Sequence, residues 1–346
     1  MIATPSNPVT AISAYIRGTA PDVCATAIDL PRPGAPMTSS AVTSRPVADG
    51  GPPVQRRRRR PTGDLAVALT FILPALVAAA ALRIWPLARA VVDSLHSTAL
   101  GLAPTEWVGL EQYRSIFTDP GFLNALKITA LFGVIINPLQ VALALALAVL
   151  LNEKLRGAGL ARTLIFLPVA IPQSVSAVIW AVAFRPDGPL NGVLALFGIG
   201  EQRFLTSPAQ ALASIMLVVS WIGIGYWMMF LIAGLKEIDP TLYEAAAIDG
   251  ASGWRTFWSV TLPQLRRQLT FVLVADTISN LLVFAPVQIL TKGGPNGRTD
   301  LIMNDVFERA YVESDAGAAA AATVVLVLVA LLIVVVQFRL LGDGEE

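Results

Sequence analysis

The sequence predicts an all-α integral membrane protein with six transmembrane helices, and three observations support this fold class. The 346 residues are 55% hydrophobic and only 14% charged, with a mean hydropathy of +0.65, well above the values of soluble domains of this size. Six apolar stretches are each long enough to cross a hydrocarbon core of roughly 30 Å as a helix. Their apolar runs are continuous, which excludes the alternating pattern of barrel strands.

These stretches follow one another along the chain, and only the fifth contains a charged residue, Asp276. They are Leu65–Leu82, Ile128–Leu151, Thr163–Phe184, Ala209–Leu235, Leu269–Leu290 and Ala316–Phe338. Prolines within them predict kinks, because proline removes a helical hydrogen bond. The prolines are Pro74, Pro138, Pro168, Pro172 and Pro286.

Residues 1–60 differ sharply from the remaining chain, 61–346. They are rich in Pro, Ala, Ser, Thr and Gly and end in five consecutive arginines, Arg56–Arg60, a composition that predicts a disordered cytosolic tail. Met37 offers a second start for translation. We therefore hypothesise that residues 1–36 are dispensable or absent in the cell.

Loop charges predict the orientation in the membrane. An even number of crossings places both termini on one side, and the arginine run before the first helix places that side in the cytoplasm. Loops 152–162 and 236–268 are denser in Lys and Arg than the loops on the other face. The outer segment "LGLAPTEWVGLEQYRSIFTDPGF" predicts short interfacial helices. We interpret the arginines as a topology signal or a lipid contact rather than a nucleic-acid patch.

Composition argues against several chemistries. Cys24 and His96 are the only cysteine and the only histidine. An internal disulfide and a cysteine metal cage are excluded, and almost no zinc or histidine-base chemistry remains. We expect no metal site and no enzymatic activity.

The longest predicted cytoplasmic loop, 236–268, has the signals of two short helices joined at an angle. Asp239 can cap a helix that begins at Pro240, and Gly250 can end it. Ser252 can cap a second helix that ends near Pro263. Residues 245–247 are all alanine, and we expect them to form a bare helix face that another protein can approach closely.

The loop contains Glu244-Ala245-Ala246, then Gly250, then Val260-Thr261-Leu262-Pro263. This pattern resembles the EAA signature of binding-protein-dependent ABC importer permeases, with Val260 where isoleucine is usual. The resemblance covers about residues 65–341 and extends to the carbohydrate-uptake branch, whose loop after the fifth helix is similar to "ILTKGGPNGRTDLI". Lys292 stands there where glycine is more common.

The resemblance implies a type I ABC importer permease fold in a bacterial inner membrane. It implies a second homologous permease, an ATPase homodimer and an extracytoplasmic solute-binding (lipo)protein as partners. ATP and Mg would be bound by the ATPase and no cofactor by this chain, which lacks a G-x-x-x-x-G-K-[ST] phosphate loop. The implied ATPase-coupling residues are Glu244, Ala245, Ala246, Asp249, Gly250, Leu262 and Pro263.

Polar residues within membrane helices are candidates for the substrate path, since burying them in lipid is costly. Helical spacing places Asp276, Ser279 and Asn280 on one face of the fifth helix. On the fourth helix it places Ser220, Gly223 and Trp227 together, with Tyr226 close by. Hydroxyl, amide and aromatic groups suit a sugar, and the resemblance places Asn280 where the maltose-transporter permease has an amide.

Each of these residues has an alternative interpretation. Asp276 can pair with an arginine or with the partner permease, and Asn280 can bond a neighbouring helix. Trp221, Tyr226 and Trp227 can be packing residues. The polar residues after Pro172 can line the path or bond backbone that the proline frees; they are Gln173, Ser174 and Ser176.

The sequence therefore predicts one permease subunit of an importer for a sugar or sugar-like solute. The main alternative is a permease for glycerol-3-phosphate or glycerophosphodiesters, for which the cationic candidates are the loop residues Lys292 and Arg298. A secondary transporter independent of ATP is a further alternative. An integral-membrane enzyme is another, but it should show a cluster of catalytic acids or metal ligands.

Overall fold

The computed structural model describes residues 61–97, 106–152 and 157–342. The elements described below belong to the unit Thr62–Glu346, apart from Pro61, the first residue of the first helix. The predicted tail 1–60, with Met37 and the arginine run, lies outside the described residues.

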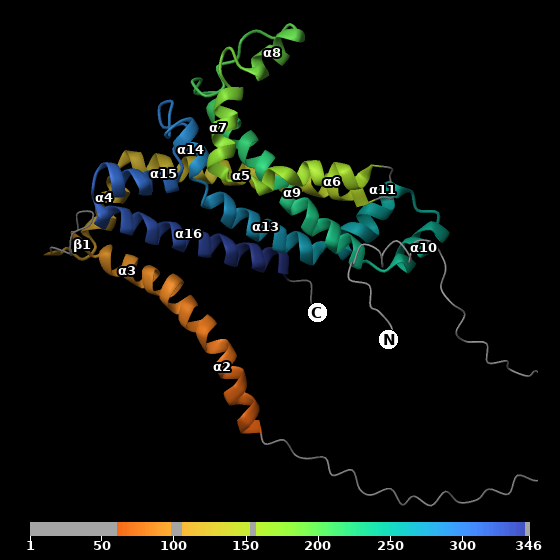
Figure 1. Cartoon of the computed structure of the whole chain (residues 1–346), viewed down its shortest axis with the longest axis horizontal. Helices are drawn as coiled ribbons and strands as arrows, with labels where there is room; N and C mark the ends of the chain where they lie inside the picture. Colours follow the sequence, from red (N-terminus) through yellow and green to blue (C-terminus); the bar gives the residue numbers. More distant parts are fainter. Residues whose placement is uncertain (1–60, 98–105, 153–156, 343–346) are drawn as a thin grey trace, which may run out of the picture. The chain divides into compact units, whose positions relative to one another are not determined.

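Within the described part, five helical segments are long and apolar enough to cross a membrane (Figure 1). The first combines α2 (Pro61–Ala79), the π-helical turn η1 (Ala80–Ile84) and α3 (Trp85–Asp93). The others are α5 (Pro120–Asn152), α9 (Ala211–Glu237), α13 (Arg266–Leu281) continued by α14 (Ala285–Leu290), and α16 (Ala316–Gly342). With a sixth, bent crossing, these confirm the predicted all-α membrane fold.

The third crossing is broken, which corrects the prediction of one kinked helix over Thr163–Phe184. It consists of α6 (Ala158–Phe166), the 3-10 turn η2 (Leu167–Ala170) and α7 (Gln173–Ala183), and its two halves meet at 103°. Ile171 is extended, with φ −92° and ψ 128°. Proline disfavours a helical conformation in the residue before it, so Pro172 accounts for the break.

Short elements fill the segments predicted to lie outside the cytoplasm. The predicted interfacial helix is present as α4 (Glu111–Thr118). A small antiparallel pair that the sequence did not indicate precedes it, β1 (His96–Ser97) and β2 (Glu106–Trp107), with His96 opposite Trp107. The remaining elements are α8 (Pro189–Leu196), α15 (Ile302–Phe307) and the π-helical turn η4 (Glu308–Val312).

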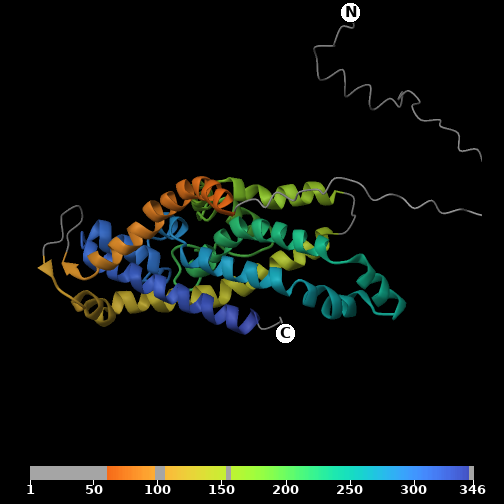
Figure 2. The same cartoon turned by 90° about the horizontal axis from the view of Figure 1, so that it is seen from below.

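The core is built around α5, α9, α13 and α16, which lie alongside one another (Figures 1 and 2). Met228 and Leu231 of α9 are fully buried in the largest apolar cluster, which α5 and α13 complete. At Gly225, α9 meets the third crossing so closely that an added Cβ would lie 2.2 Å from the carbonyl oxygen of Ile165. Glycine is therefore required at this contact.

The first crossing has a different environment from the core helices. The membrane-crossing window of α2, η1 and α3 contains no buried residue, and Phe71 and Leu82 are 79% and 75% exposed. A helix with apolar side chains on all sides is suited to a hydrocarbon environment. We conclude that this helix adds little to the core of the described chain.

Candidate functional site

A cavity of about 360 Å³ lies between α5, α9, α13 and the bend of the third crossing. We call it the polar cavity, because amide, hydroxyl, carboxyl and indole groups contribute to its wall. Its lining residues are Gln140, Val169, Ile171, Pro172, Gln173, Val219, Ile222, Gly223, Tyr226, Trp227, Asp276, Ser279, Asn280, Val283 and Pro286.

The polar cavity gathers all the predicted substrate-path residues except Ser220. From α9 come Gly223, Tyr226 and Trp227, and from α13 come Asp276, Ser279 and Asn280. Ser220 is instead buried at 7% exposure, and its hydroxyl has no partner within the described residues. Helical spacing thus identified two faces that the fold brings together.

Asp276 contributes the carboxyl group of this wall. The residue is 1% exposed, and its Oδ2 has no hydrogen-bond partner within the described residues. Trp227 and Asn280 lie within reach of its carboxylate. No arginine or lysine of the described chain pairs with it, so the alternative of an ion pair within this chain is not supported.

Asn280 bonds a neighbouring helix, as one of its two interpretations predicted, and its place in the substrate path stays a prediction. It lines the polar cavity, and its Nδ2 also donates to α5, to Asn137 Oδ1 at 2.7 Å and to Gln140 Oε1 at 2.8 Å. Its amide therefore joins α13 to α5 at the edge of the cavity.

Sequence reasoning missed Gln140, which is 1% exposed and lines the cavity from α5. The rule that intramembrane polar residues are functional candidates would have identified it within the second apolar stretch. Of the three polar residues after Pro172, Gln173 lines the cavity, whereas Ser174 and Ser176 do not. The indole of Trp221 packs edge-on against Trp180, with ring centroids 5.6 Å apart.

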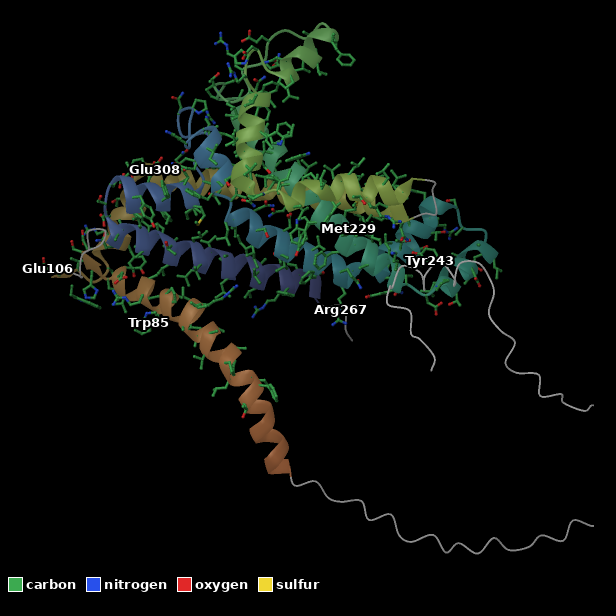
Figure 3. The ribbon with its side chains drawn as sticks, viewed as in Figure 1. Trp85, Glu106, Met229, Tyr243, Arg267 and Glu308 are labelled. Carbon is green, nitrogen blue, oxygen red and sulfur yellow. The ribbon has the colours of Figure 1, made fainter. Side chains whose placement is uncertain are left out.

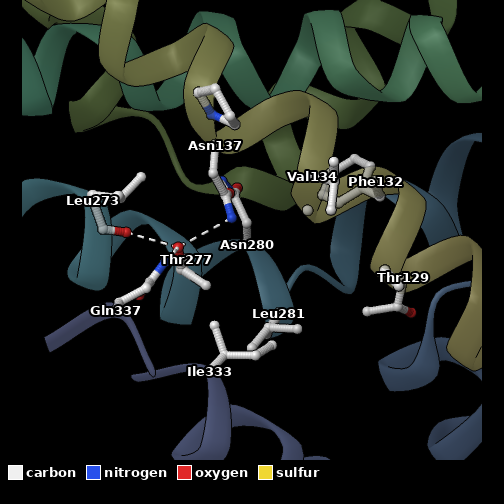
Figure 4. A pocket seen from close by; sticks show the side chains of 13 residues that line it. Thr129, Phe132, Val134, Asn137, Leu273, Thr277, Asn280, Leu281, Ile333 and Gln337 are labelled. Atoms are coloured by element: carbon white, nitrogen blue, oxygen red, sulfur yellow. Dashed lines mark hydrogen bonds between the residues drawn. The ribbon is translucent and has the colours of Figure 1, made fainter. Parts of the chain in front are cut away.

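A second cavity of about 390 Å³ lies on the other side of Asn280, between α5, α13 and α16. We call it the α16 cavity. Its wall is mainly apolar, but Asn137, Thr277, Asn280 and Gln337 converge in it (Figure 4). Asn280 lines both cavities.

Directly after the C-terminal end of α9, the chain forms the predicted pair of short helices. We call this pair, residues 239–264, the elbow. The first is α10 (Pro240–Ile248), capped by the Asp239 side chain, which accepts from Thr241 N at 2.9 Å. Accepting this bond lowers the pKa of Asp239. The second comprises α11 (Gly253–Thr256), the π-helical turn η3 (Phe257–Thr261) and α12 (Leu262–Gln264), and Ser252 caps it.

Gly250 makes the turn between the two helices, as predicted, with a φ of +70°. Its N–H donates to Ala247 O at 3.1 Å, and Ala251 N donates to Ala246 O at 2.9 Å. This pair of bonds is a Schellman motif, which favours glycine at the left-handed position. The hydroxyl of Tyr243, which is labelled in Figure 3, lies 3.2 Å from that of Thr261 and links the two arms.

The predicted ATPase-coupling residues of the elbow differ in their exposure. Glu244, Ala245 and Asp249 are exposed. Ala246 is buried, with 9% exposure, so the prediction that it forms part of a bare face is wrong. Periodicity alone could not show that α10 turns this residue toward its own chain.

The elbow also exposes large apolar side chains. Ile248 is 86% exposed and Trp254 is 71% exposed. Leu262 and Pro263 instead line a hollow that Arg266 of α13 also lines. The elbow therefore has an apolar surface of its own in addition to the predicted residues.

Lys292 occupies a backbone position that explains why glycine is more common there. Its φ is +49°, a left-handed conformation that glycine adopts without a steric cost. Within the described residues, no group of three or more His, Cys, Asp or Glu side chains could hold a metal ion.

The model of the family described as "Binding-protein-dependent transport system inner membrane component" matches residues 140–342, more than half of the chain. The chain belongs to this family. Among the relatives of this permease is the sn-glycerol-3-phosphate transport system permease protein UgpA of Agrobacterium fabrum, 31% identical over 72% of this chain and 85% of the relative. The trehalose/maltose transport system permease protein MalF of Thermococcus litoralis is 34% identical over 67% and 79%.

A further relative is the lactose transport system permease protein LacF of Rhizobium radiobacter, 36% identical over 66% of this chain and 78% of the relative. Among solved structures, a bacterial ABC transporter involved in the import of the acidic polysaccharide alginate is similar to this permease. The TM-score is 0.71 at 20% identity, covering 83% of this chain and 98% of the other. This likeness shows the type I importer permease fold. The permease is a multi-pass inner-membrane transport protein.

Proposed function

We propose that this permease forms half of the translocation pathway of an ATP-driven importer for a neutral sugar or sugar-like solute. The polar cavity is the observation that carries the proposal. It combines the aromatic rings of Tyr226 and Trp227 with the amides of Gln140 and Asn280. Rings can stack on the C–H face of a sugar, while amides and carboxylates bond its hydroxyl groups.

The charge of the cavity supports a neutral solute over a phosphorylated one. No lysine or arginine is among its lining residues, and Asp276 contributes a carboxylate. A phosphate in this cavity would find no lysine or arginine among the lining residues to balance its charge. Among the relatives, those named for trehalose/maltose and lactose are thus better guides than the one named for sn-glycerol-3-phosphate.

Energy for transport would come from a separate ATPase homodimer, which would bind ATP and Mg, because the sequence contains no phosphate loop. The elbow is the surface on which we expect the ATPase to dock. Ile248 and Trp254 supply exposed apolar area there, and Glu244 supplies an exposed charge. The rigid turn at Gly250 would pass ATPase movement to α9 and α13, which flank the elbow.

A second, homologous permease would supply the other half of the pathway, and an extracytoplasmic binding protein would deliver the solute. One solved relative of similar fold is a bacterial alginate ABC transporter in complex with an alginate pentasaccharide-bound periplasmic protein. Lipid would surround the crossings, and no part of the proposal involves nucleic acid. We place both termini in the cytoplasm, because this orientation places the elbow on the side of the membrane where the ATPase would bind.

The test is uptake by the assembled transporter in proteoliposomes. The permease is produced with its partner permease, ATPase and binding protein, and radiolabelled trehalose, maltose, lactose and sn-glycerol-3-phosphate are offered in turn. We expect uptake of at least one sugar that requires ATP and is blocked by vanadate. Uptake that persists without ATP would favour a secondary transporter, and uptake of sn-glycerol-3-phosphate alone would favour the phosphate alternative.

A further inference from the structure

A chain of hydrogen bonds runs from α16 through α13 and α5 to the polar cavity. Gln337 Nε2 donates to Thr277 Oγ1 at 2.9 Å, and Asn137 Nδ2 donates to the same oxygen at 3.1 Å. Asn280 Nδ2 then bridges Asn137 and Gln140. Figure 4 shows Asn137, Thr277, Asn280 and Gln337 converging at the α16 cavity.

One backbone carbonyl fixes the direction of every bond in this chain. Thr277 Oγ1 lies 2.7 Å from Leu273 O, and a carbonyl can only accept, so the hydroxyl proton of Thr277 is committed to it. Thr277 must then accept from its other neighbours. The side-chain amide of Asn137 must therefore orient its NH₂ toward Thr277 and its oxygen toward Asn280.

The same logic continues to the cavity. Because Asn137 offers Asn280 an oxygen, Asn280 must present its NH₂, and both bonds of that group go to α5. Gln140 must therefore use its oxygen to accept from Asn280, which leaves its own NH₂ as a donor. An amide with the opposite orientation would place two donors or two acceptors against each other.

The donor that remains is at the wall of the polar cavity. Gln140 Nε2 is buried without a partner within the described residues, and it lies 3.3 Å from the position that a Cβ would take at Gly223. Gln140, Gly223 and Asp276 line the same cavity, in which Asp276 Oδ2 is an acceptor without a partner. The wall of the cavity thus includes a buried donor and a buried acceptor that have no partner within the described residues.

We propose that Thr277, acting through Asn137 and Asn280, orients Gln140 as a hydrogen-bond donor to the transported solute, with Asp276 as an acceptor in the same cavity. Gln140 is then a recognition residue, and Thr277, which does not line the polar cavity, is a positioning residue. A hydroxyl group both donates and accepts, so adjacent sugar hydroxyls can satisfy Gln140 and Asp276 together. The inference rests on the proposed function, since it assigns polarity to the same cavity.

Solute binding to the assembled transporter without its binding protein tests the inference, because the binding protein otherwise contributes to the apparent affinity. Equilibrium dialysis with radiolabelled trehalose, maltose or lactose, whichever the wild type imports, gives the dissociation constant. Thr277→Val removes the hydroxyl and leaves the volume nearly unchanged, whereas Thr277→Ser keeps the hydroxyl. Gln140→Glu keeps an acceptor for Asn280 and removes the donor.

We expect the dissociation constant to rise about tenfold in Thr277→Val and in Gln140→Glu, as the loss of one hydrogen bond implies, and to return to the wild-type value in Thr277→Ser. Thr323→Val is the control. Among the described residues its hydroxyl bonds only Ala319 O, at 2.8 Å, within α16, and we expect unchanged binding.

Unchanged binding in Gln140→Glu would overturn the inference, even if Thr277→Val failed to fold. A loss in Thr277→Val that Thr277→Ser does not restore would also overturn it, since the role assigned to Thr277 depends on its hydroxyl. If wild-type transporter imports none of the three sugars with ATP, the proposed function fails instead. If the wild type imports a sugar with ATP and Gln140→Glu binds that sugar as tightly as the wild type does, the inference fails and the proposed function stands.

Discussion

The guanidinium of Arg309 bonds both Asp305, one helical turn before it, and Asp119, 190 residues earlier in the chain. The Arg309 and Asp305 side chains are 10% and 9% exposed, and that of Asp119 is 37% exposed. Asp119 also accepts from Gly121 N at 2.9 Å at the start of α5. One arginine thus ties η4 and α15 to the end of α5 predicted to lie outside the cytoplasm. Its bond holds the pKa of Asp119 below the usual value of 3.8.

Replacing Arg309 should strongly destabilise this end of the bundle. Arg309→Met leaves two carboxylates without their cation, and we expect the free energy of unfolding in detergent to fall by about 3 kcal/mol. Arg185→Met is the matched control, because Arg185 pairs with Asp187 at side-chain exposures of 61% and 73%. It should change stability by no more than about 1 kcal/mol. Equal effects of the two substitutions would contradict the structural role of Arg309.

Asp300 should make stability depend on pH. Burial, opposed by the bond from Asn304, raises the pKa of Asp300 from 3.8 to about 6. The native state therefore binds this proton more tightly than the unfolded chain does. The resulting stabilisation is complete below about pH 4 and is lost as the pH rises through about 6.

Asp300→Asn removes this titration and keeps an acceptor for Asn304, which donates to Asp300 at 2.8 Å. The variant should gain thermal stability relative to the wild type as the pH is raised from 4 to 7, with no gain at pH 4. Melting temperatures in detergent at a series of pH values provide the measurement. A difference that stays constant with pH would rule out the assigned titration.

Gly225 should not tolerate a side chain. Gly225→Ala places a methyl group against the Ile165 carbonyl and forces α9 away from the third crossing, at a cost of roughly 1–3 kcal/mol. Gly192→Ala on α8 is a suitable control, since a Cβ there meets nothing within 4 Å. Thermal unfolding of the two variants distinguishes them, and an unaltered melting temperature in Gly225→Ala would show that the contact is looser than described.

Gly250→Pro should uncouple transport from ATP while leaving the protein in the membrane. Proline fixes φ near −65° and has no N–H, whereas Gly250 has a φ of +70° and donates to Ala247 O. We expect sugar uptake to fall to background, with membrane levels on immunoblots close to those of the wild type.

Gly253→Pro provides the control for this substitution. Residue 253 is the first of α11, a position that favours proline, and Ser252 before it is already extended, with a ψ of 158°. We expect near-normal uptake in Gly253→Pro. Normal uptake in Gly250→Pro as well would argue against the elbow as the coupling element.

Local signals allowed the sequence to predict the elbow well. Asp239, Gly250 and Ser252 act on backbone within a few residues of themselves, so caps and the turn could be placed without tertiary information. The faces of α9 and α13 could also be predicted, because helical spacing alone determines which side chains share a face. The roles of these residues in coupling and transport stay predictions.

The remaining features depend on contacts between distant segments. The burial of Ala246 depends on how α10 packs against its own chain. Pro172 indicated a kink, but it could not specify a bend of 103°. Gln140 could have been identified as an intramembrane polar residue, but its bond to Asn280 depends on how α13 packs against α5.

The bend of the third crossing has a mechanical consequence. Ile171 and Pro172, at its apex, and Gln173, the first residue after it, all line the polar cavity, whereas Asp276 and Asn280 belong to the straight helix α13. Opening or closing this angle would swing one wall of the compartment and leave the α5–α13 amide bonds intact. A change of this angle would therefore alter the width of the polar cavity, while the hydrogen bonds of Asn280 to Asn137 and Gln140 would stay in place.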